Sequence, residues 1–103
     1  MTLREKRVAF TLAIGKLILW ANESGQPEVA IRRDGLKHME NSLHYCGLAV
    51  DLDAYRGGQY LTATEDYTAL GDHWKTLHPL ARWGGDFTNK DGCHFSFEHE
   101  GRK

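Results

Sequence analysis

Clusters of turn-forming residues divide this chain of 103 residues into short segments, and their positions limit the folds open to it. Gly, Pro, Asn and Asp favour turns because they adopt or stabilise backbone conformations that helices and strands exclude. Between the turns, hydrophobic periodicity indicates a helix, three strands, a second helix and two more strands, over 2–22, 28–33, 47–55, 60–61, 64–77, 82–87 and 93–98. This order predicts an α+β fold with a small, mainly antiparallel sheet and two main helices. The length predicts a single domain over residues 1–103.

The first predicted helix is amphipathic. Phe10, Ala13, Leu17 and Ala21 share one side at helical spacing, and we expect them to face the core. Lys16 interrupts the apolar part of the helix, which is too short to span a bilayer and has no small-residue cleavage site after it. We therefore expect neither a signal peptide nor insertion into a membrane.

Charge and composition exclude some classes of function. The formal net charge is −1 and there is no block of Lys or Arg, so nucleic acid is not expected as a partner. Six His residues are many for this length and hint at metal or acid–base chemistry. Cys46 and Cys93 form no C-x-x-C pair, and we expect two partly buried free thiols, with a single disulfide as the alternative.

Residues suited to metal binding surround the second predicted strand. Leu48 and Leu52 alternate with Asp51, so Asp51 faces away from the core if they face it. His44 precedes this strand and His94 lies on the last one, where it alternates with the apolar residues. Two His and one carboxylate leave a fourth position open, as catalytic zinc sites do.

Three local motifs strengthen this interpretation. Residues 42–51 have the pattern S-x-H-x-x-G-x-A-x-D, and W-G-G-D-F at 83–87 and D-G-C-H-F at 91–95 follow in order. Together they resemble the D-alanyl-D-alanine carboxypeptidase (VanY-like) family of peptidoglycan peptidases, most closely the phage endolysins that act as L-alanyl-D-glutamate peptidases. The resemblance is clear over residues 41–97, and the N-terminal helix is also similar to that of small phage members.

The resemblance implies a mechanism and a fold. His44, Asp51 and His94 would bind Zn²⁺, Asp91 would be the catalytic acid/base, and Ser42 would support His44 by hydrogen bonding. The implied activity is zinc-dependent hydrolysis of an amide in the stem peptide of bacterial peptidoglycan, leading to cell lysis. The implied fold is the compact α+β fold that these enzymes share with the hedgehog signalling domain.

One region departs from the family pattern. Relatives carry a longer segment before the S-x-H motif, with an R-T-x-x-x-Q stretch whose Arg binds or polarises substrate. Here Arg32 and Arg33 are the candidates for that role. A more open cleft, completion by an oligomer partner, and a degraded member of the family are the alternatives left open.

Several other polar or aromatic residues receive structural expectations. Trp83 is expected in the core or as a wall of the cleft, and Asp53 as a solvated or capping residue. Cys93 should point away from His94 on a strand, which removes it from the ligand set. The remaining histidines are expected to be structural or exposed: His38, His73, His78 and His99.

Two alternative functions remain at this point. One is a D-Ala-D-Ala carboxypeptidase, and the other is a non-catalytic binding module on the same fold, against which the presence of Asp91 argues. The expected lysin would be made in the cytoplasm of a host bacterium and act at the wall after release through a separate membrane pore. The bond cleaved, the host and the oligomeric state are left open.

Overall fold

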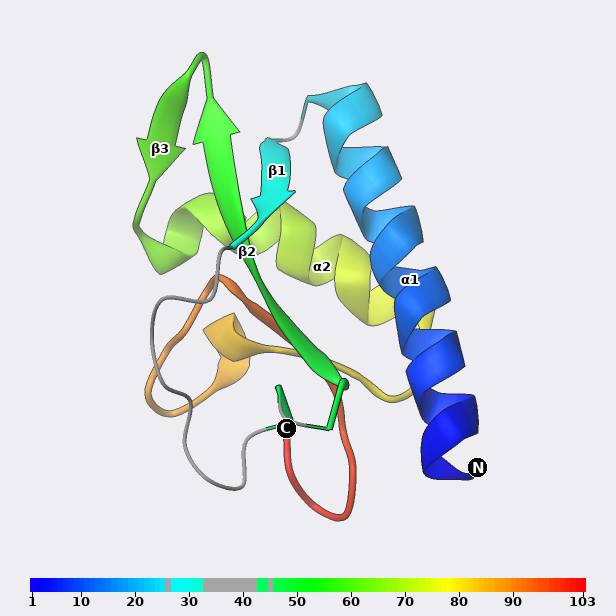
Figure 1. Cartoon of the computed structure of the whole chain (residues 1–103). Helices are drawn as coiled ribbons and strands as arrows, with labels where there is room; N and C mark the ends of the chain where they lie inside the picture. Colours follow the sequence, from blue (N-terminus) through cyan, green and yellow to red (C-terminus); the bar gives the residue numbers. More distant parts are fainter. Residues whose placement is uncertain (26, 33–42, 45) are drawn as a thin grey trace.

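Among the residues that the structure describes, two α-helices and a five-stranded sheet make up the fold, arranged as in Figure 1. The computed structural model describes residues 1–25, 27–32, 43–44 and 46–103. In chain order the elements are α1 (Leu3–Ser24), β1 (Glu28–Ile31), β2 (Ala49–Arg56), β3 (Gln59–Leu61), the 3₁₀ turn η1 (Thr64–Tyr67), α2 (Thr68–Leu77), β4 (Ala81–Trp83), the 3₁₀ turn η2 (Gly84–Asp86) and β5 (His94–Phe97). The predicted α+β class is confirmed.

Helix α1 has defined ends and a buried side. The Thr2 side chain accepts a hydrogen bond from the Glu5 N–H, and the Glu5 side chain accepts one from the Thr2 N–H. Gly25, at a φ of 68°, ends the helix in the left-handed conformation. The residues predicted to face the core are buried, and Ile14 joins them. Among the described residues, no helix is long and apolar enough to cross a membrane.

The sheet is antiparallel, with strand order β1-β2-β5-β4 and β3 paired to the far end of β2. Strands β4 and β5 form the hairpin predicted for the C-terminal half. The first strand of this hairpin is shorter than the predicted range of 82–87, because η2 begins at Gly84. Gly84 and Gly85 lack the Cβ atoms that favour a pleated strand, and here they form a tight turn instead.

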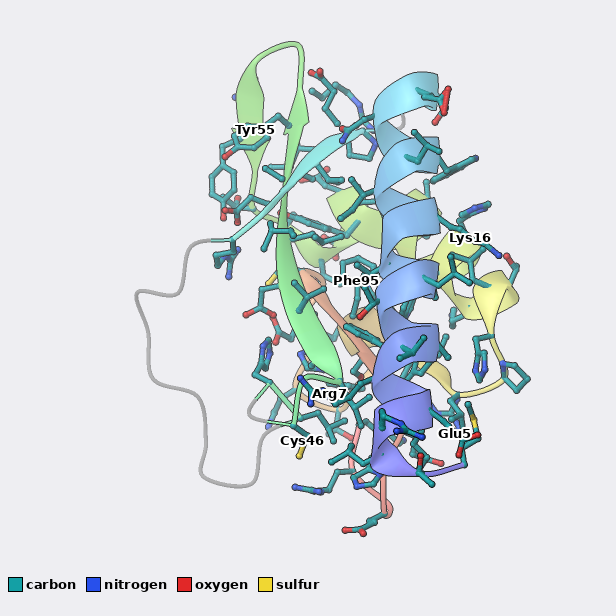
Figure 2. All side chains as sticks on the ribbon, turned by 45° about the vertical axis from the view of Figure 1, so that its right-hand side comes forward. Glu5, Arg7, Lys16, Cys46, Tyr55 and Phe95 are labelled. Carbon is teal, nitrogen blue, oxygen red and sulfur yellow. The ribbon has the colours of Figure 1, made fainter. Side chains whose placement is uncertain are left out.

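The core lies on one face of the sheet, beneath both helices. Phe97 of β5 packs edge-on against Phe10 of α1, with ring centroids 5.3 Å apart, and Trp74 of α2 contacts both rings. Phe95 lies between the sheet and α1 (Figure 2). Because side chains alternate along a strand, His94 of β5 must project from the opposite face. That opposite face carries the candidate site.

Trp83 holds the loop that leads into β5. Its indole is 5% exposed and packs against Gly71 of α2 and Gly85 of η2, where a Cβ atom would collide with the ring. Its Nε1 donates a hydrogen bond of 2.7 Å to the Gly92 carbonyl oxygen. The structure therefore places Trp83 in the core, beneath the loop that carries Asp91.

Gly84 provides a test of how tightly this loop is packed. A Cβ atom there would lie 1.9 Å from the Asp91 carbonyl oxygen and 2.9 Å from the His94 Cβ. We expect Gly84→Ala to lower the free energy of unfolding by about 1–3 kcal/mol through overpacking. Urea unfolding of the metal-free protein measures it.

Gly15 supplies the matched control. A Cβ atom at Gly15 would meet nothing within 4 Å on the exposed side of α1. Gly15→Ala should therefore stabilise the protein by up to about 1 kcal/mol, because alanine has the higher helix propensity. Equal stability of Gly84→Ala and the parent would show that the loop is not held as described.

Candidate metal centre

The pairing of β2 with β5 brings two of the predicted metal ligands together. Asp51 is directly opposite His94 in the antiparallel register. Side chains of directly opposed residues project from the same face, with Cβ atoms about 4.5–5.5 Å apart. The core-facing neighbours Leu52 and Phe95 are fully buried on the other face. The register therefore places a carboxylate and an imidazole side by side.

A tight turn before β2 supplies the third residue. The Leu43 carbonyl oxygen accepts hydrogen bonds from the N–H groups of Cys46 and Leu48, which closes the turn around His44. Gly47 has a φ of 72°, in the left-handed region that favours glycine, and its N–H donates to the His44 carbonyl oxygen. Arg7 of α1 packs against Gly47, and Figure 2 shows Arg7 close to Cys46.

His44, Asp51 and His94 form a compact group that could hold a metal ion. Asp51 Oδ1 lies 3.5 Å from His44 Nε2 and 3.8 Å from His94 Nδ1, and the three side chains are 10–15% exposed. Their ligand atoms all lie within 4.8 Å of one another. Ligands about 2.0–2.1 Å from a tetrahedral metal are about 3.3 Å apart, so these separations need little change on binding.

The carboxylate of Asp51 provides the test of fit. Its Oδ1 is buried and has no hydrogen-bond partner among the described residues, so neither imidazole contact is a hydrogen bond. A buried charged oxygen without a partner destabilises a protein, typically by more than 1 kcal/mol. A cation between Oδ1 and the two ring nitrogens would supply the missing partner, so the residues present fit a metal ion.

A contact behind His94 determines which ring nitrogen faces the group. His94 Nε2 lies 3.0 Å from the main-chain oxygen of Lys103, which also accepts a hydrogen bond from Ser96 Oγ. Because that oxygen can only accept, Nε2 carries the proton and donates. In the neutral ring, Nδ1 then presents a lone pair towards Asp51, as a metal ligand must.

Asp91 and Cys93 lie beside this group. Their ligand atoms and that of Asp51 lie within 4.8 Å of one another, and Cys93 Sγ donates to Asp91 Oδ1 at 3.2 Å. Cys93 was expected to point away from the site by strand alternation, but β5 begins only at His94, so the alternation does not apply. Burial, followed by the hydrogen bond to Asp91, raises the pKa of the Cys93 thiol to about 12.

Arg32 lies at the end of β1, and its main-chain N–H donates to the Asp51 carbonyl oxygen. Its Nε donates to Asp53 Oδ1 at 2.7 Å, and its Nη2 donates to the Tyr60 hydroxyl at 3.0 Å. Burial alone would lower the pKa of Arg32. The hydrogen bond to Asp53 and nearby negative charges outweigh this effect, so the pKa of Arg32 lies above its ordinary value. Asp53, expected to be solvated or capping, is instead the ionic partner of Arg32. Arg33 and Ser42 lie outside the described residues.

The remaining described histidines have structural contacts, as predicted. The ring of His73 stacks on Trp20, His78 stacks on Phe97, and His99 Nδ1 lies 3.0 Å from Lys6 Nζ. Cys46 and Cys93 are free thiols, and both are partly buried. Sequence reasoning missed the support that Lys103 gives to His94, because a main-chain oxygen has no signature in a sequence.

The fold and this group of side chains define a small α+β protein with a candidate metal centre. Residues 37–97, more than half of the chain, match the model of a protein family described as D-alanyl-D-alanine carboxypeptidase. The chain belongs to this family and is therefore a member of a family of peptidases.

A solved structure supports the fold. The chain is similar to the crystal structure of the L-Ala D-Glu endopeptidase ChiX from Serratia marcescens. The two sequences are 21% identical, and the match covers 92% of this chain and 85% of the ChiX chain. The TM-score of 0.66 shows that the two proteins share a fold. A comparison with curated proteins found no match.

The partnerless oxygen of Asp51 gives a prediction about the metal-free protein. Asp51→Asn keeps the shape of the side chain, removes its charge, and provides an amide that can donate to an imidazole nitrogen. We expect it to raise the free energy of unfolding of the metal-free protein by about 1 kcal/mol. Added zinc should stabilise the parent but no longer stabilise this variant.

Asp86→Asn is the control, because Asp86 is exposed and pairs with Lys75 on the surface. It should change the stability by less than about 0.5 kcal/mol and keep the stabilisation by zinc. Thermal unfolding with and without zinc measures both effects. A destabilised Asp51→Asn variant that zinc still stabilises like the parent would contradict the assignment.

Proposed function

We propose that the protein is a zinc-dependent peptidase that hydrolyses an amide bond in the stem peptide of bacterial peptidoglycan. The observation that carries the proposal is the buried oxygen of Asp51, which lies close to two imidazole nitrogens and has no hydrogen-bond partner among the described residues. It occurs in a chain whose family consists of peptidases. The ChiX endopeptidase, which acts on an L-Ala D-Glu bond by its title, supports the L-alanyl-D-glutamate bond as the target.

In this proposal, three side chains hold the zinc ion: His44 through Nε2, Asp51 through Oδ1 and His94 through Nδ1. Zinc, when bound, would lower the pKa of a water molecule and polarise the scissile carbonyl group. Ser96 and the main-chain oxygen of Lys103 keep the His94 ring in its orientation and tautomer.

Asp91 is proposed as the catalytic acid/base. Its side chain is exposed and lies next to that of Asp51. Its Oδ1 already accepts a hydrogen bond from the Cys93 thiol. Oδ2 is therefore the oxygen proposed to take a proton from water and to return it to the leaving amine. The hydrogen bond from Cys93 and the clamp of Trp83 on Gly92 hold the carboxylate in place.

The substrate separates this proposal from its alternatives. The description of the family favours a D-Ala-D-Ala carboxypeptidase as the second candidate. Mass spectrometry of peptidoglycan fragments distinguishes the two, because only a carboxypeptidase would release free D-alanine. Lysis of cells, as by a phage endolysin, is part of the proposal for the endopeptidase.

Digestion of purified peptidoglycan tests the proposed class of reaction. A stem-peptide peptidase should release new amino groups and leave the glycan intact, so the number of reducing sugar ends should stay constant. A chelator should stop the release, and zinc should restore it. New reducing ends without new amines would contradict the proposal and indicate a glycosidase.

A second prediction separates catalysis from metal binding. Asp91→Asn keeps a turn-compatible side chain but removes the base, and loss of a general base typically lowers a rate by ~10²–10⁴. We expect the variant to keep its zinc content and melting temperature while amine release falls at least ~100-fold. Full activity would make Asp91 only a turn residue. Loss of zinc together with activity would make it a ligand.

A further inference from the structure

A small polar pocket adjoins the candidate metal centre. Its volume is about 170 Å³, and it lies between the end of β1, the segment from β3 to η1, and the loop before β5. Asp91 and Cys93 line the pocket and also lie within 4.8 Å of the ligand atom of Asp51. A group bound in the pocket would therefore lie next to the amide that the proposed function cleaves.

The guanidinium of Arg32 is held rigidly at this pocket. Asp53 Oδ1 accepts from both Arg32 Nε and the Tyr60 hydroxyl, at 2.7 Å and 3.2 Å, and Tyr60 accepts from Arg32 Nη2. Guanidinium carries five N–H donors, and these contacts use two of them. The other donors have no partner among the described residues. A positioned guanidinium with free donors is suited to a planar carboxylate.

Other donors line the same pocket. Lys90, Thr62 and Thr64 are among the lining residues, and none of their side chains has a hydrogen bond or ion pair among the described residues. The carboxylate of Asp53 already forms an ion pair with Arg32. Asp91 also lines the pocket, and its ligand atom lies within 4.8 Å of that of Asp51. Apart from Asp91, the charged side chains that line the pocket are therefore the cations Arg32 and Lys90.

We propose that this pocket binds a carboxylate of the substrate peptide next to the scissile amide, held by Arg32 and Lys90. This inference rests on the proposed peptidase function and gives it a substrate class: peptides whose residue at the scissile bond carries a free carboxylate. Asp53 and Tyr60 act as positioning residues for Arg32. Amidation of that carboxylate removes its charge and so weakens its hydrogen bonds to Arg32 and Lys90. We therefore expect the peptide with the free carboxylate to bind about 10- to 100-fold more tightly than the amidated peptide.

Binding of two matched peptides tests the inference. Both are L-Ala-γ-D-Glu-L-Lys with a methylene in place of the scissile carbonyl, so neither is cleaved. In one the glutamate α-carboxylate is free, and in the other it is an amide. Calorimetry with the full-length protein as purified should show at least ~10-fold tighter binding of the acid.

Variants assign the preference to the pocket. Lys90→Gln and Arg32→Gln should each lower the preference for the acid, and Lys90 is exposed, so its substitution should not disturb folding. Lys16→Gln is the control, because Lys16 is exposed on α1 (Figure 2) and is not one of the residues that line the pocket. It should keep the full preference. Equal affinities for the two peptides, absence of binding, or an unchanged preference in both pocket variants would overturn the inference.

Hydrolysis of the corresponding cleavable peptides tests the proposed function separately. A preference for the acid without hydrolysis would support the pocket and contradict the peptidase. Hydrolysis of acid and amide with equal KM would support the peptidase and contradict the pocket.

Discussion

The register between β2 and β5 is the constraint on which the rest of the site depends. It places Asp51 opposite His94 on one face, while Leu52 and Phe95 enter the core on the other. A shift of one residue would turn both polar side chains into the core and expose the apolar ones. The aromatic packing of Phe97 with Phe10 and Trp74 therefore fixes the candidate metal centre from the opposite side of the sheet.

The burial of Asp51 lowers the stability of the metal-free fold. Asp51 holds a buried oxygen without a hydrogen-bond partner among the described residues, close to two imidazoles. Among the described residues, no hydrogen bond to Asp51 Oδ1 offsets the burial of its charge, and a neutral side chain would relieve that burial. Stability is commonly lost at sites that are arranged to bind something, and the proposed metal ion would restore it here.

Much of the fold could be predicted from periodicity. The buried side of α1, the alternation of Leu48 and Leu52 with Asp51, and the C-terminal hairpin follow from local patterns. The start of β5 at His94 could not be predicted in this way, because local patterns do not fix the end of a strand to a single residue. That uncertainty is the reason that the position of Cys93 was predicted wrongly.

The site was less accessible to sequence reasoning. The His and Asp residues of the motifs could be named, since their types and spacing carry the chemistry. The link from Arg32 to Asp53 and Tyr60 joins residues far apart in the chain, and neither partner has a diagnostic neighbour. The support of His94 comes from a main-chain oxygen, which every residue has. Such contacts exist only once the strands are paired.

X-ray absorption spectroscopy of the zinc-loaded protein tests the metal centre directly. We expect only nitrogen and oxygen neighbours, at about 2.0–2.2 Å, with outer-shell scattering from two imidazole rings. This result would place zinc between His44, Asp51 and His94. A sulfur neighbour at about 2.3 Å would instead make a cysteine such as Cys93 a ligand and contradict the assignment. Scattering from fewer than two imidazoles would contradict it as well.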